Sequence, residues 1–353
     1  MEIKNISANN FRNIEDLNLE FDSGTNIFCG QNGMGKTNLL EAVWMLCGEK
    51  SFRGNRDLDL IMKGKEKSII SAEIESLGTK KDISLVISEK RTASVLSKPL
   101  KSPHELSEVF NASVFSPIDL NLMSDGPKIR RKFMDTTLCQ LFPKYSSALR
   151  LYKRALEQRN AVLRDARYHR EIEGMLYPIE FNMERAAEVI TTYRKRLVEH
   201  YCEILPEFYE KMAGKNEKVH IKYIEKAEVS LSAELEKSRK EDILSGNTSV
   251  GPHRDDILIL INGEDTRNFA SQGQKRSAAL SLKLSEAALI ERVRGEKPVI
   301  LLDDVMSELD NSRQSGLIKA VEGSQVFITC CDKNNINALK DGKVFNIEEG
   351  RIV

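Results

Sequence analysis

Hydrophobic and polar residues alternate along much of the first third of the chain. Alternation with a period of two is typical of β-strands with one buried face. We therefore expect strands within residues 2–28, at Ser68–Ser76 and at Asp82–Ser88, and then a hairpin or flexible edge up to Pro103. This part of the chain predicts an antiparallel-rich sheet.

The middle of the chain is charged and helical in pattern. Apolar residues recur at helical spacing over Lys144–Arg170 and over Met183–Leu205, where we expect the helix to end before Pro206. This spacing places them on one face of a helix. The repeats do not continue as heptads over many turns, so we expect a compact helical lobe without a long coiled coil.

Strand patterns return near Gly246. Ile257–Ile261 leads into the hairpin pair Asn262-Gly263, and a helix is expected from Ser271 to about Arg294. The continuous apolar run Val299–Leu302 is typical of a buried parallel strand, and we expect Gln325–Thr329 to be another buried strand.

The segment after the first buried strand fits G-x-x-x-x-G-K-[ST] at every fixed position. It lies between a predicted strand, Thr25–Cys29, and a predicted helix, Asn38–Cys47. Backbone N–H groups and the helix dipole then point at one spot, and glycine lets the backbone approach a phosphate closely. Lys36 would reach the β- and γ-phosphates, and Thr37 would hold Mg²⁺. This predicts a nucleoside triphosphate site at Gly30, Gln31, Asn32, Gly33, Met34, Gly35, Lys36 and Thr37.

A buried strand that ends in two acids, Val299–Asp304, is the expected partner of this loop. A carboxylate at the carboxyl end of such a strand can reach the Mg²⁺ that bridges the phosphates, and we assign this role to Asp303. Asp304 is the candidate general base, which with Lys36 forms the predicted catalytic pair. Arg12 lies over the nucleotide or is a surface arginine at a turn; the spacing favours neither.

Ser271-Gln272-Gly273-Gln274 opens a predicted helix with a hydroxyl, a glycine and unpaired N–H groups, which suit a phosphate. One glycine loop already surrounds the γ-phosphate within a subunit. We therefore expect Ser271, Gly273 and Gln274 to act on the nucleotide of a second subunit. The alternative is a plain helix N-cap.

Size and composition narrow the classes of protein. A chain of 353 residues can hold two domains, and 53 Lys+Arg against 53 Asp+Glu leave no net charge that points to nucleic acid. No apolar run approaches the ~20 residues of a membrane helix, and no signal-peptide profile is present. The six cysteines show no metal or redox spacing. We expect a cytoplasmic protein.

Local clusters of cations are the candidates for a DNA-binding surface. Residues 144–170 contain eight Lys or Arg against two acids, a net charge of +6. Non-specific DNA binding needs such a row of cations facing the phosphates. A solvated helix face is the alternative, and no motif that reads base edges is present. The candidate DNA-binding residues are Lys128, Arg130, Arg131, Lys153 and Arg154.

The order of the motifs is typical of one family. The phosphate loop, S-x-G-Q, the acidic strand and Ser307-Glu308-Leu309-Asp310 follow one another along the chain. The chain resembles ATP-binding-cassette (ABC) ATPases of the chromosome-maintenance and DNA-repair branch, and within this ABC/SMC-like family the bacterial members of recombination and replication repair. The closer resemblance rests on Asn10–Asn13, Val114–Pro117, Gly126-Pro127 with Arg130-Arg131 and Phe133, Leu156–Asn160, Gly251–Asp256 and Leu302–Asp310.

The resemblance implies an α/β fold in which an ABC-type P-loop ATPase lobe of mixed sheet and helices, residues 1–117 and 243–353, is interrupted by a mostly helical lobe, residues 118–242. It implies that ATP with Mg²⁺ joins two copies into a homodimer that binds DNA, whether single-stranded, duplex or gapped. Hydrolysis would be weak and stimulated by DNA. Proteins of this branch work with the mediators RecR and RecO to load a recombinase in the damage (SOS) response.

The chain departs from cassette ATPases at two places. Thr329-Cys330-Cys331-Asp332 has no switch histidine, and no loop glutamine is evident near Ser116–Asp119. Two roles are open for His253: it senses nucleotide or DNA, or it is a loop histidine whose ring nitrogens are satisfied by hydrogen bonds within the protein. The alternative function is a P-loop phosphotransferase acting on a small molecule, which has no use for S-x-G-Q with S-E-L-D. A scaffold with a vestigial site is the third possibility.

Overall fold

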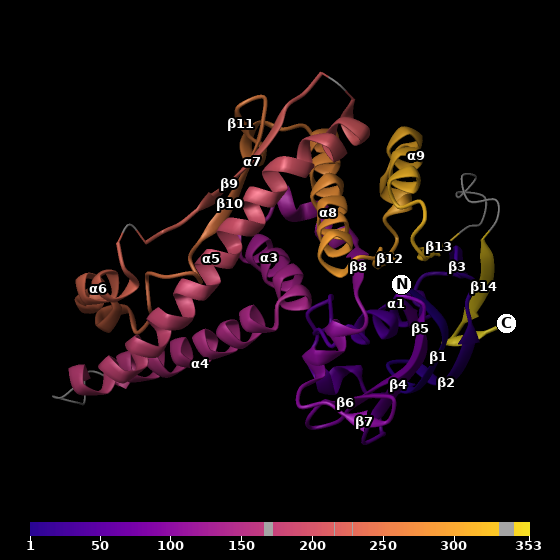
Figure 1. The fold of residues 1–353 in the computed structure, drawn as a ribbon, viewed down its shortest axis with the longest axis horizontal. Helices are drawn as coiled ribbons and strands as arrows, with labels where there is room; N and C mark the ends of the chain where they lie inside the picture. Colours follow the sequence, from indigo (N-terminus) through magenta and orange to yellow (C-terminus); the bar gives the residue numbers. More distant parts are fainter. Residues whose placement is uncertain (166–171, 215, 228, 332–341) are drawn as a thin grey trace. The chain divides into compact units, whose positions relative to one another are not determined.

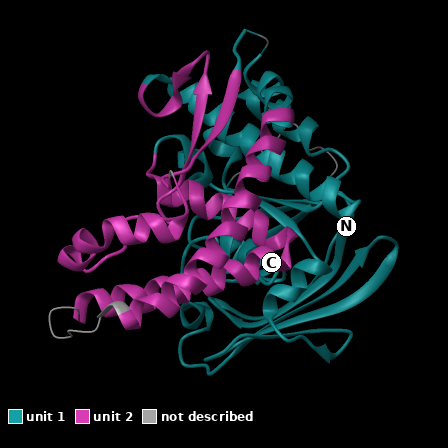
Figure 2. Cartoon of the chain, turned by 60° about the vertical axis from the view of Figure 1, so that its left-hand side comes forward, with its two compact units in different colours: residues 1–124, 204–218, 269–353 teal, residues 125–203, 219–268 magenta. Residues whose placement is uncertain are grey.

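The structure, a computed structural model, describes residues 1–165, 172–214, 216–227, 229–331 and 342–353. The chain forms two compact units, shown in teal and magenta in Figure 2. Unit 1 consists of residues 1–124, 204–218 and 269–353, and unit 2 of residues 125–203 and 219–268.

The first sheet of unit 1 is antiparallel, with the strand order β2-β1-β4-β5-β6-β7 (Figure 1). It confirms the predicted N-terminal sheet and the hairpin before Pro103. Its strands are β1 (Glu2–Phe11), β2 (Ile14–Glu20), β4 (Ser68–Ser76), β5 (Thr79–Ile87), β6 (Thr92–Val95) and β7 (Lys98–Pro99).

The second sheet of unit 1 has the order β15-β14-β3-β13-β12-β8, and all its neighbours except β14 and β15 run parallel. Its strands are β3 (Thr25–Cys29), β8 (Ala112–Phe115), β12 (Val299–Leu302), β13 (Val326–Cys330), β14 (Lys343–Glu348) and β15 (Arg351–Ile352). Leu302 pairs with Phe115 on one side and Ile328 on the other, and Cys330 pairs with Cys29. The carboxyl ends of these strands therefore meet at one edge, where ligands of open α/β sheets bind.

Helix α1 (Lys36–Met45) contacts β1 of the first sheet and β13 of the second. Leu39, Leu40 and Val43 are buried as predicted, and Trp44 and Met45 are buried too, as expected for a helix that is covered on all sides. This packing holds the start of α1 in a fixed place. The other helices of unit 1 are α2 (Pro117–Leu120), α8 (Gln272–Arg294) and α9 (Asn311–Ala320), with short 3-10 turns at η1 (Asp57–Leu60), η2 (Pro103–Glu108), η3 (Asn121–Met123) and η5 (Met306–Glu308).

Unit 2 combines helices with a three-stranded sheet, β11-β10-β9. The strands are β9 (Val219–Ile224), β10 (Asp256–Ile261) and β11 (Glu264–Asp265), and the helices are α3 (Pro127–Leu141), α4 (Pro143–Asp165), α5 (Ile172–Ala213), α6 (Leu231–Ser245) and α7 (Thr266–Phe269), the last turns of α5 and the end of α7 belonging to unit 1. Among the described residues, no helix is both long enough and apolar enough to span a membrane.

Several boundaries differ from the predicted ones. Residues 118–124 and 204–218, which were predicted within the helical lobe, belong to unit 1. Residues 243–268 belong to unit 2 because β10 pairs with β9, although they follow the helical segment in the chain. The helix predicted to end before Pro206 continues to Ala213, because Tyr209 and Met212 remain buried beyond the proline. Packing over these turns outweighs the loss of one backbone hydrogen bond.

Candidate nucleotide-binding site

The phosphate loop joins β3 to α1 at the carboxyl edge of the parallel sheet. Gly35 is the N-cap of α1 with φ 110°, a conformation that other residues rarely adopt. A Cβ atom at Gly30 would lie 2.4 Å from the carbonyl oxygen of Ile347, and one at Gly35 would lie 2.9 Å from the Asn13 amide. Gly30 is therefore required by the close packing of the loop, and Gly35 by its backbone conformation.

Lys36 begins α1 and is largely buried. Its Nζ donates to the carbonyl oxygens of Gly30, at 2.6 Å, and Gln31, at 3.0 Å. The loop thus curls around the ammonium group and holds it where phosphates would bind. The contact of Lys36 with the β- and γ-phosphates stays a prediction.

Thr37 and Asp303 meet although they lie far apart in the chain. The Thr37 hydroxyl donates to Oδ1 of Asp303 at 2.8 Å. Asp303 is buried, and burial raises the pKa of its carboxyl group above the usual value. A hydroxyl and a carboxylate are hard oxygen ligands of the kind that Mg²⁺ prefers together with substrate phosphates. The donor set therefore fits the predicted Mg²⁺.

Asp304 directly follows Asp303 in a left-handed conformation, with φ 53°. Its backbone N–H donates to Oγ1 of Thr329 at 2.8 Å, and the Ser307 hydroxyl donates to its carbonyl oxygen at 2.8 Å. The turn directs the two neighbouring acids differently, so that Asp303 contacts the loop while Asp304 is partly exposed.

Arg12 is held by a buried acid that the sequence reasoning missed. Its Nε and Nη2 donate to Oε2 of Glu41 at 2.9 and 2.8 Å, and Nη2 also donates to Asn55 at 2.9 Å. Glu41 lies on α1, one turn after Thr37, and is fully buried. The sequence does contain a signal for this pair. Glu41 is an acid within the apolar run Leu39–Trp44, and a buried carboxylate needs a partner. Neither predicted alternative for Arg12 included this ion pair.

Ser271 is the N-cap of α8 and is exposed. Its hydroxyl accepts from the Gln274 N–H at 3.2 Å, and the Gln274 side chain accepts from the Ser271 N–H at 2.7 Å. A Cβ atom at Gly273 would lie 3.0 Å from Nη2 of Arg313. The N-cap interpretation is confirmed, and it leaves the start of α8 open to solvent.

The segment after the acidic strand is tied to α8. Arg276 of α8 donates to the carbonyl oxygen of Glu308 at 2.6 Å and to its carboxylate at 2.7 Å. Asp310 caps α9 by accepting from the Arg313 N–H at 3.0 Å, and Arg313 also donates to Ser277 at 2.9 Å. These contacts connect the S-x-G-Q helix with the S-E-L-D segment within unit 1.

The candidate DNA-binding residues divide into two groups. Arg130 is buried and donates to both carboxylate oxygens of Asp256, at 2.8 and 2.9 Å. Its prediction as a DNA contact is therefore wrong, because a buried, paired guanidinium cannot reach DNA phosphates. Arg131 is half-buried and donates to the Asp255 carbonyl oxygen at 2.7 Å. Lys128, Lys153 and Arg154 are exposed on α3 and α4.

Both ring nitrogens of His253 have partners. Nε2 lies 3.0 Å from the carbonyl oxygen of Thr248, so it carries the proton, and Nδ1 accepts from the Tyr152 hydroxyl at 2.8 Å. Burial lowers the pKa of this imidazole to about 4. The arrangement agrees with a satisfied loop histidine.

The fold and the site define an ABC-type ATPase of the SMC-head class. Smc head domains from Pyrococcus furiosus and Pyrococcus yayanosii share the fold at 15% and 13% identity, with TM-scores of 0.54 and 0.58 over 99% of this chain and 95% and 96% of theirs. The RecF/RecN/SMC N-terminal domain family matches residues 2–351.

Within this class, the chain belongs to the RecF family. The proteins called DNA replication and repair protein RecF from Agathobacter rectalis and Listeria welshimeri are 36% and 37% identical to it over the whole chain and 99% of their length. Solved structures of the recombination mediator RecF of the RecFOR pathway, with ATPrS and with ATP, match at TM-scores of 0.92 and 0.90. Both are 35% identical and cover 99% of this chain and 97% and 96% of theirs. The resemblance to DNA-repair ATPases is confirmed, and DNA replication and repair is the role of the family.

Proposed function

We propose that this chain is an ATP-operated DNA-binding protein of recombinational repair and replication restart. ATP joins two copies into a DNA clamp, which helps RecR and RecO load a recombinase at gaps, and slow, DNA-stimulated hydrolysis resets it. The structures of a related recombination mediator with ATP and ATPrS support ATP as the ligand.

The observation that carries the proposal is the hydrogen bond from Thr37 to Asp303, which brings the phosphate loop and the acidic strand together. Lys36 neutralises phosphate charge from within the loop. Bound Mg²⁺, held by Thr37 and Asp303, would supply a further positive charge. Asp304 orients a water molecule or accepts its proton.

The second subunit completes the site in this proposal. Ser271 lies exposed at the start of α8, and its helix N-terminus favours an anion. Ser271, Gly273 and Gln274 of one copy would then close over the triphosphate of the other. Lys128, Arg131, Lys153 and Arg154 remain the proposed DNA contacts.

Sedimentation of the full chain tests the clamp. With Asp304→Asn to block hydrolysis, we expect dimers with ATP and monomers without it, and monomers for Ser271→Arg under both conditions. Dimerisation of Ser271→Arg equal to that of the unaltered chain would contradict the role of Ser271. Monomers at every ATP concentration, with phosphate passed to a metabolite, would instead support the small-molecule phosphotransferase.

DNA affinity tests the coupling to ATP. We expect ATP to raise the affinity of the unaltered chain, but not of Lys36→Ala, for single-stranded, duplex or gapped DNA at one fixed salt concentration. If Lys36→Ala binds DNA and its partners as the unaltered chain does, the site is vestigial and the protein a scaffold.

A further inference from the structure

Three cysteines gather at the carboxyl ends of β3 and β13, beside the phosphate loop. Cys29 ends β3 and Cys330 ends β13; the two are register partners, and their sulfurs lie 2.9 Å apart. Cys331 comes next in the chain. Its Sγ lies 2.9 Å from Oδ1 of Asn32 and 3.6 Å from Nζ of Lys36. A thiol thus contacts two phosphate-loop side chains, and the proposed function gives it no role.

The three thiols differ in their access to solvent. Cys29 and Cys330 are buried and Cys331 is exposed; Cys202, on α5, is the other exposed cysteine of the described residues. Burial and the contact with Cys29 raise the pKa of Cys330 to about 12, so Cys330 stays protonated at neutral pH. Cys331 is the sulfur that reagents can reach, and the Lys36 ammonium lies beside it to pair with a thiolate.

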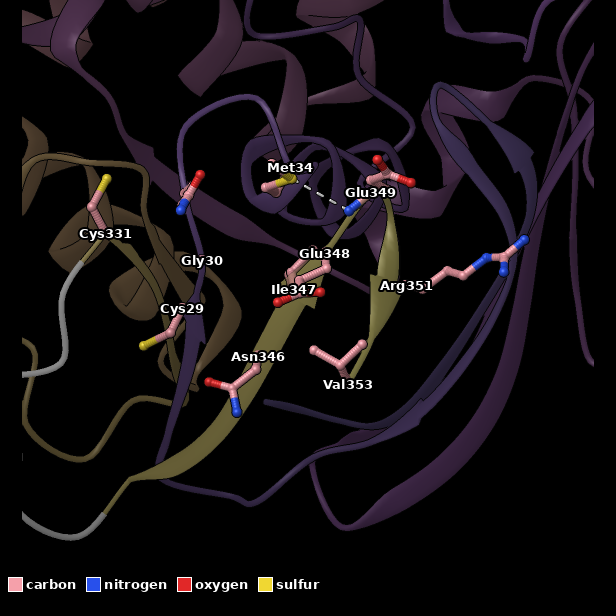
Figure 3. A pocket seen from close by; sticks show the side chains of 11 residues that line it. Cys29, Gly30, Met34, Cys331, Asn346, Ile347, Glu348, Glu349, Arg351 and Val353 are labelled. Atoms are coloured by element: carbon pink, nitrogen blue, oxygen red, sulfur yellow. Dashed lines mark hydrogen bonds between the residues drawn. The ribbon is translucent and has the colours of Figure 1, made fainter.

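A cavity of about 640 Å³ lies next to Cys331. Cys29, Gly30 and Gln31 line it together with β14 and β15, and Figure 3 shows Cys29 and Cys331 on one side of Gly30 and Asn346–Glu348 on the other. Its volume is within the roughly 300–1,000 Å³ of small-molecule sites. Its wall carries the carboxylates of Glu348 and Glu349 and the guanidinium of Arg351, which is also paired with Glu15 at 3.6 Å. Charges of both signs suit a small molecule that carries an ammonium group as well as carboxylates.

We propose that Cys331 is an S-thiolation site that controls access to the phosphate loop, and that the group it takes is a charged low-molecular-weight thiol of the glutathione type. The Cys331 thiolate attacks one sulfur of the small-molecule disulfide. The S–S bond of that molecule breaks, a mixed disulfide forms on Cys331, and the other half leaves as a thiolate. Attack by a second small thiol reverses the step.

The attached group separates Cys331 from Asn32 and Lys36 and places carboxylates beside the lysine that the triphosphate needs. These carboxylates and the triphosphate are both negative and repel each other, so the modified protein should lose ATP binding. This inference rests on the proposed nucleotide site.

The test treats the full, reduced chain with glutathione disulfide and follows each cysteine by peptide mass spectrometry. We expect Cys331 to be modified faster than Cys202. ATP at ten times its Kd should slow modification of Cys331 about tenfold, because about one molecule in ten is then free of ATP, and should leave Cys202 unchanged.

ATP affinity is measured on the same samples with a fluorescent analogue. Thiolation should weaken it about tenfold or more, by the loss of one charge-assisted contact, and dithiothreitol should restore it. Cys331→Ser should show no response to glutathione disulfide, whereas the matched variant Cys202→Ser should respond like the unaltered chain.

Two results would overturn the inference: modification of Cys331 no faster than that of Cys202, or a thiolated Cys331 with unchanged ATP affinity. Failure of the untreated, reduced chain to bind ATP would overturn the proposed nucleotide site instead, so the two failures are distinguishable.

Discussion

The hydroxyl of Thr329 donates a 3.1 Å hydrogen bond to the carboxylate of Asp303. The same hydroxyl accepts the backbone N–H of Asp304 at 2.8 Å. One side chain of β13 therefore positions both acids at the end of the neighbouring strand. Asp304 has φ 53°, a conformation that costs a non-glycine residue about 1–3 kcal/mol unless its surroundings hold it.

Thr329→Val should separate hydrolysis from binding. The variant keeps the shape of the side chain but removes the hydroxyl, so we expect ATP turnover to fall about tenfold or more through misplacement of the acids. Unfolding should become easier by about 1–2 kcal/mol. Single-turnover hydrolysis and nucleotide titration measure the two effects, and Thr329→Ser is the control that keeps the bond. A loss of ATP affinity with turnover intact would contradict this role.

The ion pair of Arg12 and Glu41 predicts strong coupling between the two residues. Arg12→Ala removes two hydrogen bonds from a fully buried carboxylate, and breaking a buried pair costs about 3–5 kcal/mol of stability. Urea unfolding of Arg12→Ala, Glu41→Ala and the double variant measures the coupling. The double variant should lose clearly less stability than the sum of the two single ones; simple additivity would show that the pair does not act as a unit.

Arg130 and Lys128 lie near each other in sequence on α3, but alanine substitution should change the stability of the protein by very different amounts at the two positions. Arg130→Ala leaves buried Asp256 without its main partner and should destabilise the protein by about 3–5 kcal/mol. Lys128 is exposed, so Lys128→Ala should change stability by less than about 0.5 kcal/mol.

The same exposed cations carry the DNA prediction. If Lys128, Lys153 and Arg154 contact phosphates, each alanine variant should weaken DNA binding and reduce the slope of log K against log salt by about one. Fluorescence anisotropy over a series of salt concentrations gives this slope. An unchanged slope for all three variants would place DNA elsewhere on the protein.

His253 predicts a pH dependence of stability. Its pKa is lowered from 6.5 to about 4 in the folded state. Between these pH values the unfolded chain binds a proton that the folded chain does not, which favours unfolding. The folded state therefore has its full stability above pH 6.5 and loses part of it as the pH falls toward 4. The change amounts to about 3 kcal/mol at most. Unfolding free energies of the unaltered chain and His253→Asn across this range should differ in slope; parallel curves would exclude the histidine as the cause.

The sequence by itself determined the elements whose causes are local. The glycine loop between strand and helix and β3 at Thr25–Cys29 appear as predicted, and Ser271 is the helix N-cap given as the alternative to a serine that acts on a second subunit. Spacing, turn chemistry and capping act over a few neighbouring residues. The order of the motifs was also sufficient to indicate the family.

Only the tertiary structure decided which distant residues meet. The burial of Arg130 against Asp256, the pairing of Arg12 with Glu41 and the transfer of β10 to unit 2 depend on contacts between distant parts of the chain. The sequence does not show whether a charged residue faces solvent or a buried partner, since burial is a property of the assembled fold. For the same reason the contact of Cys331 with Lys36, made across two parallel strands, could not be derived from cysteine spacing.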